Sequence, residues 1–379
     1  MISLYINFLN ISDHINIEKV RKINIWKICF MKNLLSRQTY DTEYEILMEL
    51  GSGTHGDVVL GRDSKGGTAA LKYISKKDSK TFISEISTLS KLNHPCVVRF
   101  YGYVLGSKIH DNDYCIILEY MPNESLKSVY QKIREGDTPN GWGPTAKSKI
   151  AFGVAAGMAY LHLNDVLHRD LKPDNIFLDY NLEPKISDFG LSKNQPIEAQ
   201  MKKKPSSIKY MSPALLEKST KQKTTLINDD SFADVYAFGV LLLSIAVESE
   251  PQFSSTKVIK AYKDAKAHII NGGRYVIPND IPPKLKSLIT ECWTGSGQKL
   301  VFDEIVNMIS KNPKDYSFPG TDMDEFVRYI TMINNVNKVE KSKLSPEFSV
   351  KPIVKSSSTS KYGGKKKPII VKARPDFLS

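Results

Sequence analysis

An acid, a base and an amide stand together on one short polar segment, residues 168–175, which read HRDLKPDN. A further acid, Asp188, stands thirteen residues after Asn175 and directly precedes a Phe-Gly pair. Asp188 and Asn175 could hold Mg²⁺ on a nucleoside triphosphate, while Asp170 accepts the proton of an attacking hydroxyl. Lys172 would lie beside the transferring phosphoryl group and offset its charge. These residue types at this spacing predict phosphoryl transfer, although a polar loop after a buried helix could carry the same residues.

A glycine-rich segment lies upstream, between an apolar stretch that ends at Leu50 and another that begins at Val58. Its residues are Gly51, Ser52, Gly53, Thr54, His55 and Gly56. Glycines let the backbone bend tightly and bring its amide groups close to phosphates. An ordinary hairpin would carry the same residues, so the neighbouring motifs must decide between the two interpretations.

One lysine, Lys72, interrupts the apolar strand expected over residues 69–74. A helix is expected to follow, because apolar residues recur at spacings of three and four from Phe82 onwards. Glu85 lies on this helix, thirteen residues after Lys72. Taken alone, a lysine in mid-strand or a glutamate on a helix is usually a solvated surface residue.

Taken in this order, the motifs resemble those of the eukaryotic protein kinase family over about residues 44–312. Two later elements, Asp234-Val235-Tyr236 and Cys292-Trp293, are similar to the tyrosine-kinase-like group, whose members mostly phosphorylate Ser and Thr. The resemblance implies an α+β, two-lobed fold, in which a small antiparallel sheet with one helix sits on a larger, mainly helical lobe. It also implies ATP and Mg²⁺ as cofactors, and a protein hydroxyl as the acceptor of the γ-phosphoryl group.

The resemblance also implies roles for individual residues. Lys72 would bind the α- and β-phosphates and pair with Glu85, since either charge buried alone is unfavourable. The implied catalytic residues are Asp170, Lys172, Lys72 and Glu85, and the implied metal ligands are Asn175 and Asp188. The implied nucleotide contacts are the six residues of the glycine-rich segment together with Val58, Ala70, Lys72, Glu119, Met121 and Phe177. Among these, Glu119 and Met121 would lie in the hinge between the lobes.

The polar segment over residues 190–212 corresponds, in this resemblance, to the activation loop. It contains Ser206 and Ser207. We expect a phosphate on Ser206 to order the loop through Arg169, because a phosphoserine brings nearly two negative charges and strong acceptors. Ser207 is expected to contribute a structural hydroxyl.

One departure from the family pattern follows the activation loop. Ala214 stands where the family usually has a Glu, and Lys299 is the best match to the Arg with which that Glu pairs. Because both partners have changed, no unpaired buried charge need remain. The departure bears on the stability of the larger lobe and not on the chemistry.

The composition bounds the class of the protein and its environment. A chain of 379 residues that is 41% hydrophobic can bury a sizeable core. The four cysteines show no paired spacing, which favours a reducing compartment, so we expect a cytoplasmic location, or a nuclear one given the basic tail. The longest apolar run, residues 235–247, is short for a membrane span, and the start of the chain lacks a signal-peptide pattern.

The net charge of +12 is concentrated at the end of the chain. Residues 338–379 hold eleven Lys or Arg against three Asp or Glu, a balance of +8, so the basic pI is no argument for specific nucleic-acid binding. We expect a poorly ordered extension over residues 1–43, the kinase domain over 44–312, an additional helix within 313–337, and a disordered Ser- and Lys-rich tail over 338–379. The additional helix is expected over residues 322–336.

Three other interpretations stay open. A pseudokinase that serves as an interaction scaffold would lack at least one of the four central polar residues, and all four are present: Lys72, Asp170, Asn175 and Asp188. A tyrosine or dual-specificity kinase shares many of the motifs, although Lys172-Pro173 is typical of Ser/Thr kinases. Nucleic-acid binding by the basic tail is the third.

Overall fold

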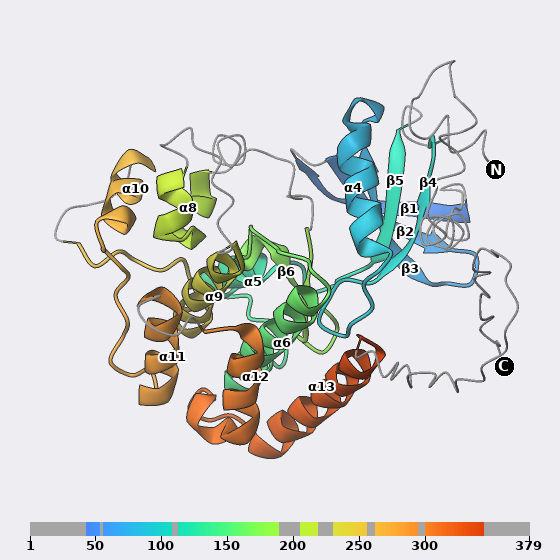
Figure 1. Cartoon of the computed structure of the whole chain (residues 1–379). Coiled ribbons are helices and arrows are strands. Elements are labelled where there is room, and N and C mark those ends of the chain that lie inside the picture. Colours follow the sequence, from blue (N-terminus) through green and yellow to red (C-terminus); the bar gives the residue numbers. More distant parts are fainter. Residues whose placement is uncertain are drawn as a thin grey trace, which may run out of the picture.

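The structure is a computed structural model that describes residues 43–53, 56–107, 113–188, 205–218, 230–255, 262–294 and 300–344. The described chain forms two lobes, a smaller one built on a β-sheet and a larger one made mainly of helices (Figure 1). The predicted two-lobed α+β fold is therefore confirmed.

The smaller lobe is a five-stranded antiparallel sheet with the strand order β1-β2-β3-β5-β4. Its strands are β1 Tyr44–Gly53, β2 Gly56–Asp63, β3 Thr68–Ile74, β4 Phe100–Val104 and β5 Tyr114–Glu119. In β3, Lys72 lies opposite Val58 of β2 and Ile116 of β5. Because side chains alternate along a strand, Lys72 and Ala70 share one face of the sheet and Leu71 lies on the other.

A single long helix, α4 Ser79–Leu89, packs against this sheet after a short 3₁₀ turn, η2 Lys76–Asp78 (Figure 1). Its buried residues, Phe82, Glu85, Ile86 and Leu89, recur at helical spacing and so form one stripe. Phe82 stacks on Tyr114 of β5 with a centroid separation of 4.5 Å. The sequence pattern that predicted this helix thus also sets the face on which Glu85 lies.

The larger lobe follows β5. Its helices are α5 Leu126–Arg134, α6 Pro144–Leu163, α8 Pro213–Lys218, α9 Asp230–Val247, α10 Tyr262–Ile270, α11 Pro283–Thr294, α12 Phe302–Lys311 and α13 Met323–Leu344. The short elements among them are η3 Pro173–Asn175, β6 Ile176–Leu178, β7 Pro184–Ile186, η4 Pro205–Tyr210 and η5 Pro313–Tyr316. β6 and β7 pair as a two-stranded antiparallel sheet.

Two helices form the centre of this lobe. Residues 148–161 of α6 are buried without interruption, and so are residues 234–245 of α9. A helix that is buried on every side belongs to a core, which explains why neither sequence shows a one-sided apolar stripe. The polar segment over residues 168–175 follows α6, and Asp234 lies near the start of α9. Both core helices therefore help to position this segment.

One expectation about element bounds is wrong. The helix expected over residues 322–336 continues to Leu344, so the expectation of a disordered tail is wrong for residues 338–344. The expectations for residues 1–42 and 345–379 lie outside the described residues.

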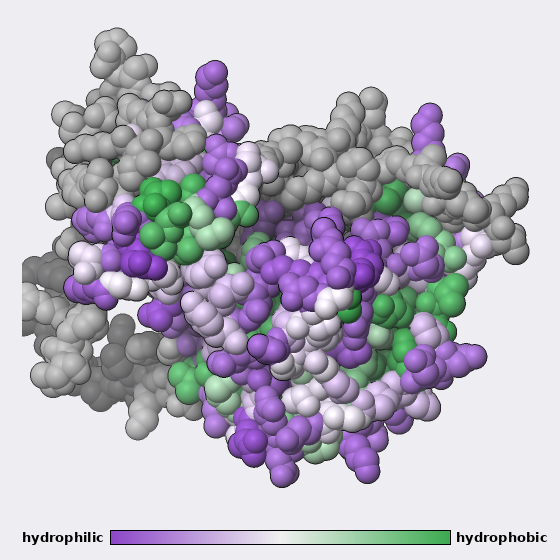
Figure 2. Space-filling view, turned by 180° about the vertical axis from the view of Figure 1, so that it is seen from behind, coloured by the Kyte–Doolittle hydropathy of each residue, from purple (hydrophilic) through white to green (hydrophobic). Residues whose placement is uncertain are grey.

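Seen from the opposite side, much of the surface is hydrophilic, with apolar residues gathered on the smaller lobe and along one flank of the larger lobe (Figure 2). The large hydrophobic side chains that β1 exposes are Ile46, Met48 and Leu50. None of the helices in the described part of the chain is long and apolar enough to cross a membrane.

Candidate active site

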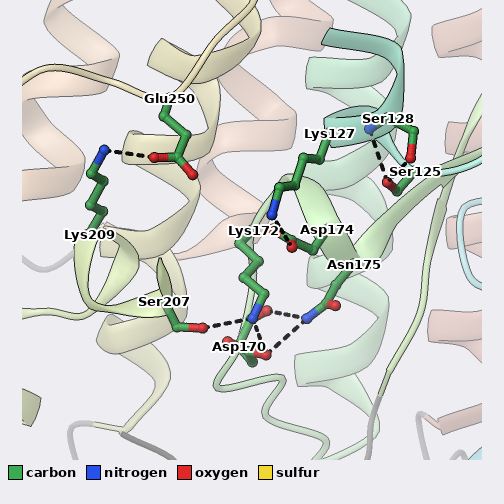
Figure 3. Close-up of polar contacts among 10 residues, drawn as sticks. All are labelled: Ser125, Lys127, Ser128, Asp170, Lys172, Asp174, Asn175, Ser207, Lys209 and Glu250. Carbon is green, nitrogen blue, oxygen red and sulfur yellow. Dashed lines mark hydrogen bonds and ion pairs between the residues drawn. The ribbon is translucent and has the colours of Figure 1, made fainter. Parts of the chain in front are cut away.

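The polar segment after α6 forms a compact hydrogen-bonded group around Asp170 (Figure 3). Lys172 Nζ donates to Asp170 Oδ2 at 2.7 Å and to Ser207 Oγ at 2.7 Å. Asn175 Nδ2 donates to the Asp170 backbone carbonyl at 2.6 Å and to its Oδ2 at 3.1 Å. These bonds turn the Asn175 amide oxygen away from Asp170, as Figure 3 shows. The structure thus brings together Asp170, Lys172 and Asn175, and adds Ser207 from η4.

Asp234 holds the backbone of this segment in place. Its carboxylate accepts hydrogen bonds from the backbone N–H groups of His168 at 2.9 Å and Arg169 at 2.7 Å. His162 Nε2 lies 2.9 Å from Asp234 Oδ2. Burial alone would raise the pKa of Asp234, but His162, His168 and the Arg169 backbone N–H together outweigh it and hold this pKa below its ordinary value. The same anchor fixes Arg169 in the left-handed region at φ 66°, which a non-glycine residue rarely adopts.

His168 connects the segment to the strand that carries Asp188. Its Nδ1 accepts from the Asp170 backbone N–H at 3.3 Å, so the ring proton belongs on Nε2. That Nε2 lies 2.9 Å from the carbonyl oxygen of Ser187, to which it donates. The imidazole therefore ties the position of Asp170 to that of Asp188, one residue beyond Ser187. The sequence alone indicated no role for His162 or His168, although His168 begins the polar segment and His162 precedes it by six residues.

The charged pair predicted between the two elements of the smaller lobe is formed. Lys72 Nζ lies 2.7 Å from Glu85 Oε1 and 4.0 Å from Asp188 Oδ1. Lys72 is buried and Glu85 is only 3% exposed, so neither is a solvated surface residue. Burial alone would lower the pKa of Lys72, but the carboxylates of Glu85 and Asp188 outweigh it and raise the pKa above its ordinary value. The ammonium charge is therefore retained in the interior.

The glycine-rich segment joins β1 to β2. Gly51 pairs with Val58, Ser52 with Asp57, and Gly53 with Gly56. Gly56 has φ +108°, and a Cβ atom there would overlap the backbone carbonyl oxygen of Tyr73 in β3. Only glycine fits this close approach. Thr54 and His55, between the strands, lie outside the described residues.

Three apolar residues expected to contact the nucleotide, Val58, Ala70 and Phe177, are only partly buried. Ala70 stays half-buried although its neighbours Ala69 and Leu71 are buried, and Val58 and Phe177 are half-buried as well. Such half-buried apolar side chains among buried ones leave apolar surface open to a ligand.

The two residues expected in the hinge, Glu119 and Met121, are held by contacts within the protein. The Glu119 side chain is bonded to Lys185 Nζ at 3.0 Å, and its backbone N–H donates to the carbonyl of Arg99 at 2.9 Å. Met121 is buried, and its carbonyl accepts from the Glu124 N–H at 3.1 Å. Because the Glu119 carboxylate is already engaged, a nucleotide contact there would use the backbone.

The sequence model of the protein kinase domain matches residues 44–306, which is more than half of the chain. The chain belongs to the protein kinase domain family. The family match begins at β1 and ends within α12, so it contains every element of the site, whereas α13 lies beyond it.

Named relatives support the same assignment. The chain is 32% identical over 283 residues to a probable serine/threonine-protein kinase of Dictyostelium discoideum, covering 72% of this chain and 28% of the relative. It is 34% identical over 216 residues to an L-type lectin-domain containing receptor kinase of Arabidopsis thaliana, covering 55% and 30%. It is 32% identical over 276 residues to a dual specificity protein kinase of D. discoideum, covering 66% and 11%. The chain thus spans less than a third of each of these relatives.

The donor set of the kinase domain fits a magnesium ion. Asp188 and the outward-facing amide oxygen of Asn175 are oxygen donors, which Mg²⁺ prefers. Within the described ranges, no group of three or more His, Cys, Asp or Glu could hold a metal. A pair of protein ligands is what Mg²⁺ commonly uses when substrate phosphates supply further oxygens.

The departures noted in the sequence fall at the edge of the described chain. Ala214 lies exposed on α8, and Lys299, the residue matched to its expected partner, lies outside the described residues. Lys202, Lys203 and Lys204 of the expected activation loop, and the side chain of Ser206, lie outside them as well. Ser207 is described, buried and bonded to Lys172, in keeping with the structural hydroxyl expected for it.

Proposed function

We propose that this chain is an ATP-dependent protein kinase that phosphorylates Ser and Thr residues of a protein substrate, with Mg²⁺ as the metal. The observation that carries the proposal is the buried Lys72–Glu85 pair at 2.7 Å with Asp188 only 4.0 Å from the same ammonium group. Three elements of the chain converge there, and this arrangement serves to bind phosphates and their metal.

The residues of the chain divide the work of the reaction. Asp188 and Asn175 would hold the metal, and Lys72 would orient the phosphates. MgATP supplies the phosphoryl group, and its metal ion would neutralise part of the negative charge on the phosphates. Asp170, held by Lys172 and Asn175, is placed to accept the proton of the attacking hydroxyl. Lys172, whose amine is fully buried beside Asp170, offsets negative charge as the hydroxyl attacks.

Serine and threonine are favoured as acceptors because Lys172 and Ser207 stand at positions where the resemblance to Ser/Thr kinases places such residues. Their hydrogen bond of 2.7 Å places η4 against the catalytic segment. The names of the relatives support the same class, since one is a serine/threonine-protein kinase and one a dual specificity kinase. Dual specificity is therefore the second candidate. A pseudokinase scaffold is disfavoured, because Lys72, Asp170, Asn175 and Asp188 are all retained.

The test incubates the full chain with γ-labelled MgATP and a mixed protein substrate, followed by acid hydrolysis and phosphosite mapping. We expect phosphoserine and phosphothreonine, and no transfer by Asp188→Asn with the fold retained. Phosphotyrosine as a main product would indicate dual specificity, and an inactive wild type would support the scaffold. A cytoplasmic location and the lack of a nucleic-acid partner stay predictions from the sequence.

A further inference from the structure

The last described helix, α13, lies beyond the residues that match the kinase domain, and it packs along α6 towards the smaller lobe (Figure 1). Its N-terminal half is built into the larger lobe. Tyr329 is 5% exposed, and a Cβ atom on Gly153 of α6 would overlap its hydroxyl. Lys149 of α6 lies 3.1 Å from Glu325 and 3.1 Å from Glu183. The glycine and the buried lysine give α6 a packing surface that is complementary to α13.

The same helix contacts the loop that joins α4 to β4. Asn337 Oδ1 lies 2.9 Å from His94 Nε2, and the Tyr329 hydroxyl lies 3.5 Å from Cys96 Sγ. His94 Nδ1 accepts from the Cys96 backbone N–H at 3.1 Å, so its proton belongs on Nε2 and is donated to Asn337. His94 is 5% exposed and stacks on Tyr160 of α6 with a centroid separation of 4.8 Å.

This loop is a junction between two parts of the active site. On one side it follows α4, which carries Glu85. On the other side it is bonded to β7, because Ile186 N–H donates to the Cys96 carbonyl at 2.8 Å and Val98 N–H donates to the Ile186 carbonyl at 2.9 Å. Asp188 follows Ile186 by two residues. Any displacement of residues 94–98 would therefore change the positions of both Glu85 and Asp188.

We propose that α13 is a strut that fixes this loop, with Asn337 as a positioning residue for Glu85 and Asp188. The helix extends from its contacts with α6 to the α4–β4 loop. It therefore restrains this loop against the larger lobe, and with it the helix that carries Glu85 and the segment that carries Asp188. The unit that carries full activity is then residues 44–344, and not the shorter stretch that matches the family. The activity readout of this proposal rests on the proposed kinase function.

The test compares two alanine variants of the full chain that each remove one side-chain hydrogen bond of α13. Asn337→Ala removes the bond to His94, whereas Asn334→Ala removes a bond of 2.9 Å to Ser310 within the larger lobe. We expect Asn337→Ala to raise the KM for ATP about fivefold, from the loss of one hydrogen bond near 1 kcal/mol, and Asn334→Ala to change it less than about twofold. Asn337→Asp, which keeps an acceptor for His94, should restore the wild-type KM.

Hydrogen exchange provides the second measurement and does not depend on catalysis. Backbone amides of residues 90–98 and 184–188 should exchange faster in Asn337→Ala than in Asn334→Ala at equal melting temperatures. Equal effects of the two alanine variants, or unchanged exchange at residues 90–98, would overturn the proposal. If the wild type transfers no phosphate, the proposed function fails, and the exchange comparison alone decides whether the strut exists.

Discussion

Lys172 Nζ donates to Ser207 Oγ across 2.7 Å, and so joins the catalytic segment to the residues that precede α8. Lys172 is 1% exposed and Ser207 is 3% exposed, so the contact lies in the interior. The same amine also bonds Asp170, which makes the Ser207 hydroxyl part of the arrangement that positions the base. A phosphate on Ser207 would have no room beside these groups, and this residue is thus a structural partner of Lys172.

Ser207→Ala should therefore lower kcat about tenfold or more, because a hydrogen bond to a buried charged group contributes about 1.5–3 kcal/mol. Ser207→Thr keeps the hydroxyl and serves as the matched control, with activity close to that of the wild type. Steady-state kinetics before and after phosphatase treatment provide the measurement. A Ser207→Ala protein with normal kcat would contradict the role assigned to the hydroxyl.

Lys72→Met should reduce phosphoryl transfer by about a hundredfold or more, the range typical for removing one group that stabilises developing charge. The substitution also leaves the Glu85 carboxylate buried without its partner at 2.7 Å. Lys147→Met is the control, since Lys147 pairs with Glu248 at 2.8 Å in the larger lobe, away from β3. Each variant loses a close ion pair, and Lys72→Met also loses the 4.0 Å contact with Asp188, so equal losses of activity would mean that Lys72 has no special part in catalysis.

Gly56→Ala should destabilise the smaller lobe and weaken ATP binding. The added methyl group would overlap the Tyr73 carbonyl, and φ +108° is strained for any residue with a side chain, at about 1–3 kcal/mol. Gly51→Ala is the control for stability, because a Cβ atom there meets no other atom within 4 Å. The melting temperature should drop by several degrees for Gly56→Ala and stay nearly unchanged for Gly51→Ala. Equal melting temperatures would show that the backbone of β3 moves to accept the added methyl group without loss of stability.

The motifs that sequence reasoning found are those in which chemistry restricts residue types over a short span. Lys72 and Glu85 lie thirteen residues apart on a strand and the next helix, and it is the resemblance of the surrounding motifs to the kinase family that suggests the pair. The contact of His94 with Asn337 joins residues 243 positions apart, and no local pattern marks either one. It depends on how α13 lies on α6, which the packing at Gly153 decides. The contact of His162 with Asp234 likewise joins separate core helices, although the Asp234-Val235-Tyr236 motif already marks Asp234 in the sequence.

The last prediction concerns the pH dependence of stability and His94. Burial lowers the pKa of His94 from the ordinary 6.5 to about 4, and the hydrogen bond to Asn337 offsets only part of this effect. Glu340 also opposes the shift and Lys185 adds to it. As the pH falls from about 6.5 to about 4, the unfolded chain therefore takes up a proton at this residue that the folded protein does not. The folded state loses stability through this window, by at most about 1.4 kcal/mol per pH unit.

His94→Gln should remove this contribution, because a glutamine amide can donate to Asn337 and accept from Cys96 without titrating. The measurement is chemical unfolding of the wild type and the variant at about pH 6.5, 5.5 and 4.5, which span the window between the two pKa values. The free energy of unfolding should fall less steeply with decreasing pH in the variant, and the two should differ least in slope above about pH 6.5, where the unfolded histidine is already neutral. Parallel curves at lower pH would show that His94 is protonated in the folded protein, and that burial does not hold it in its neutral form.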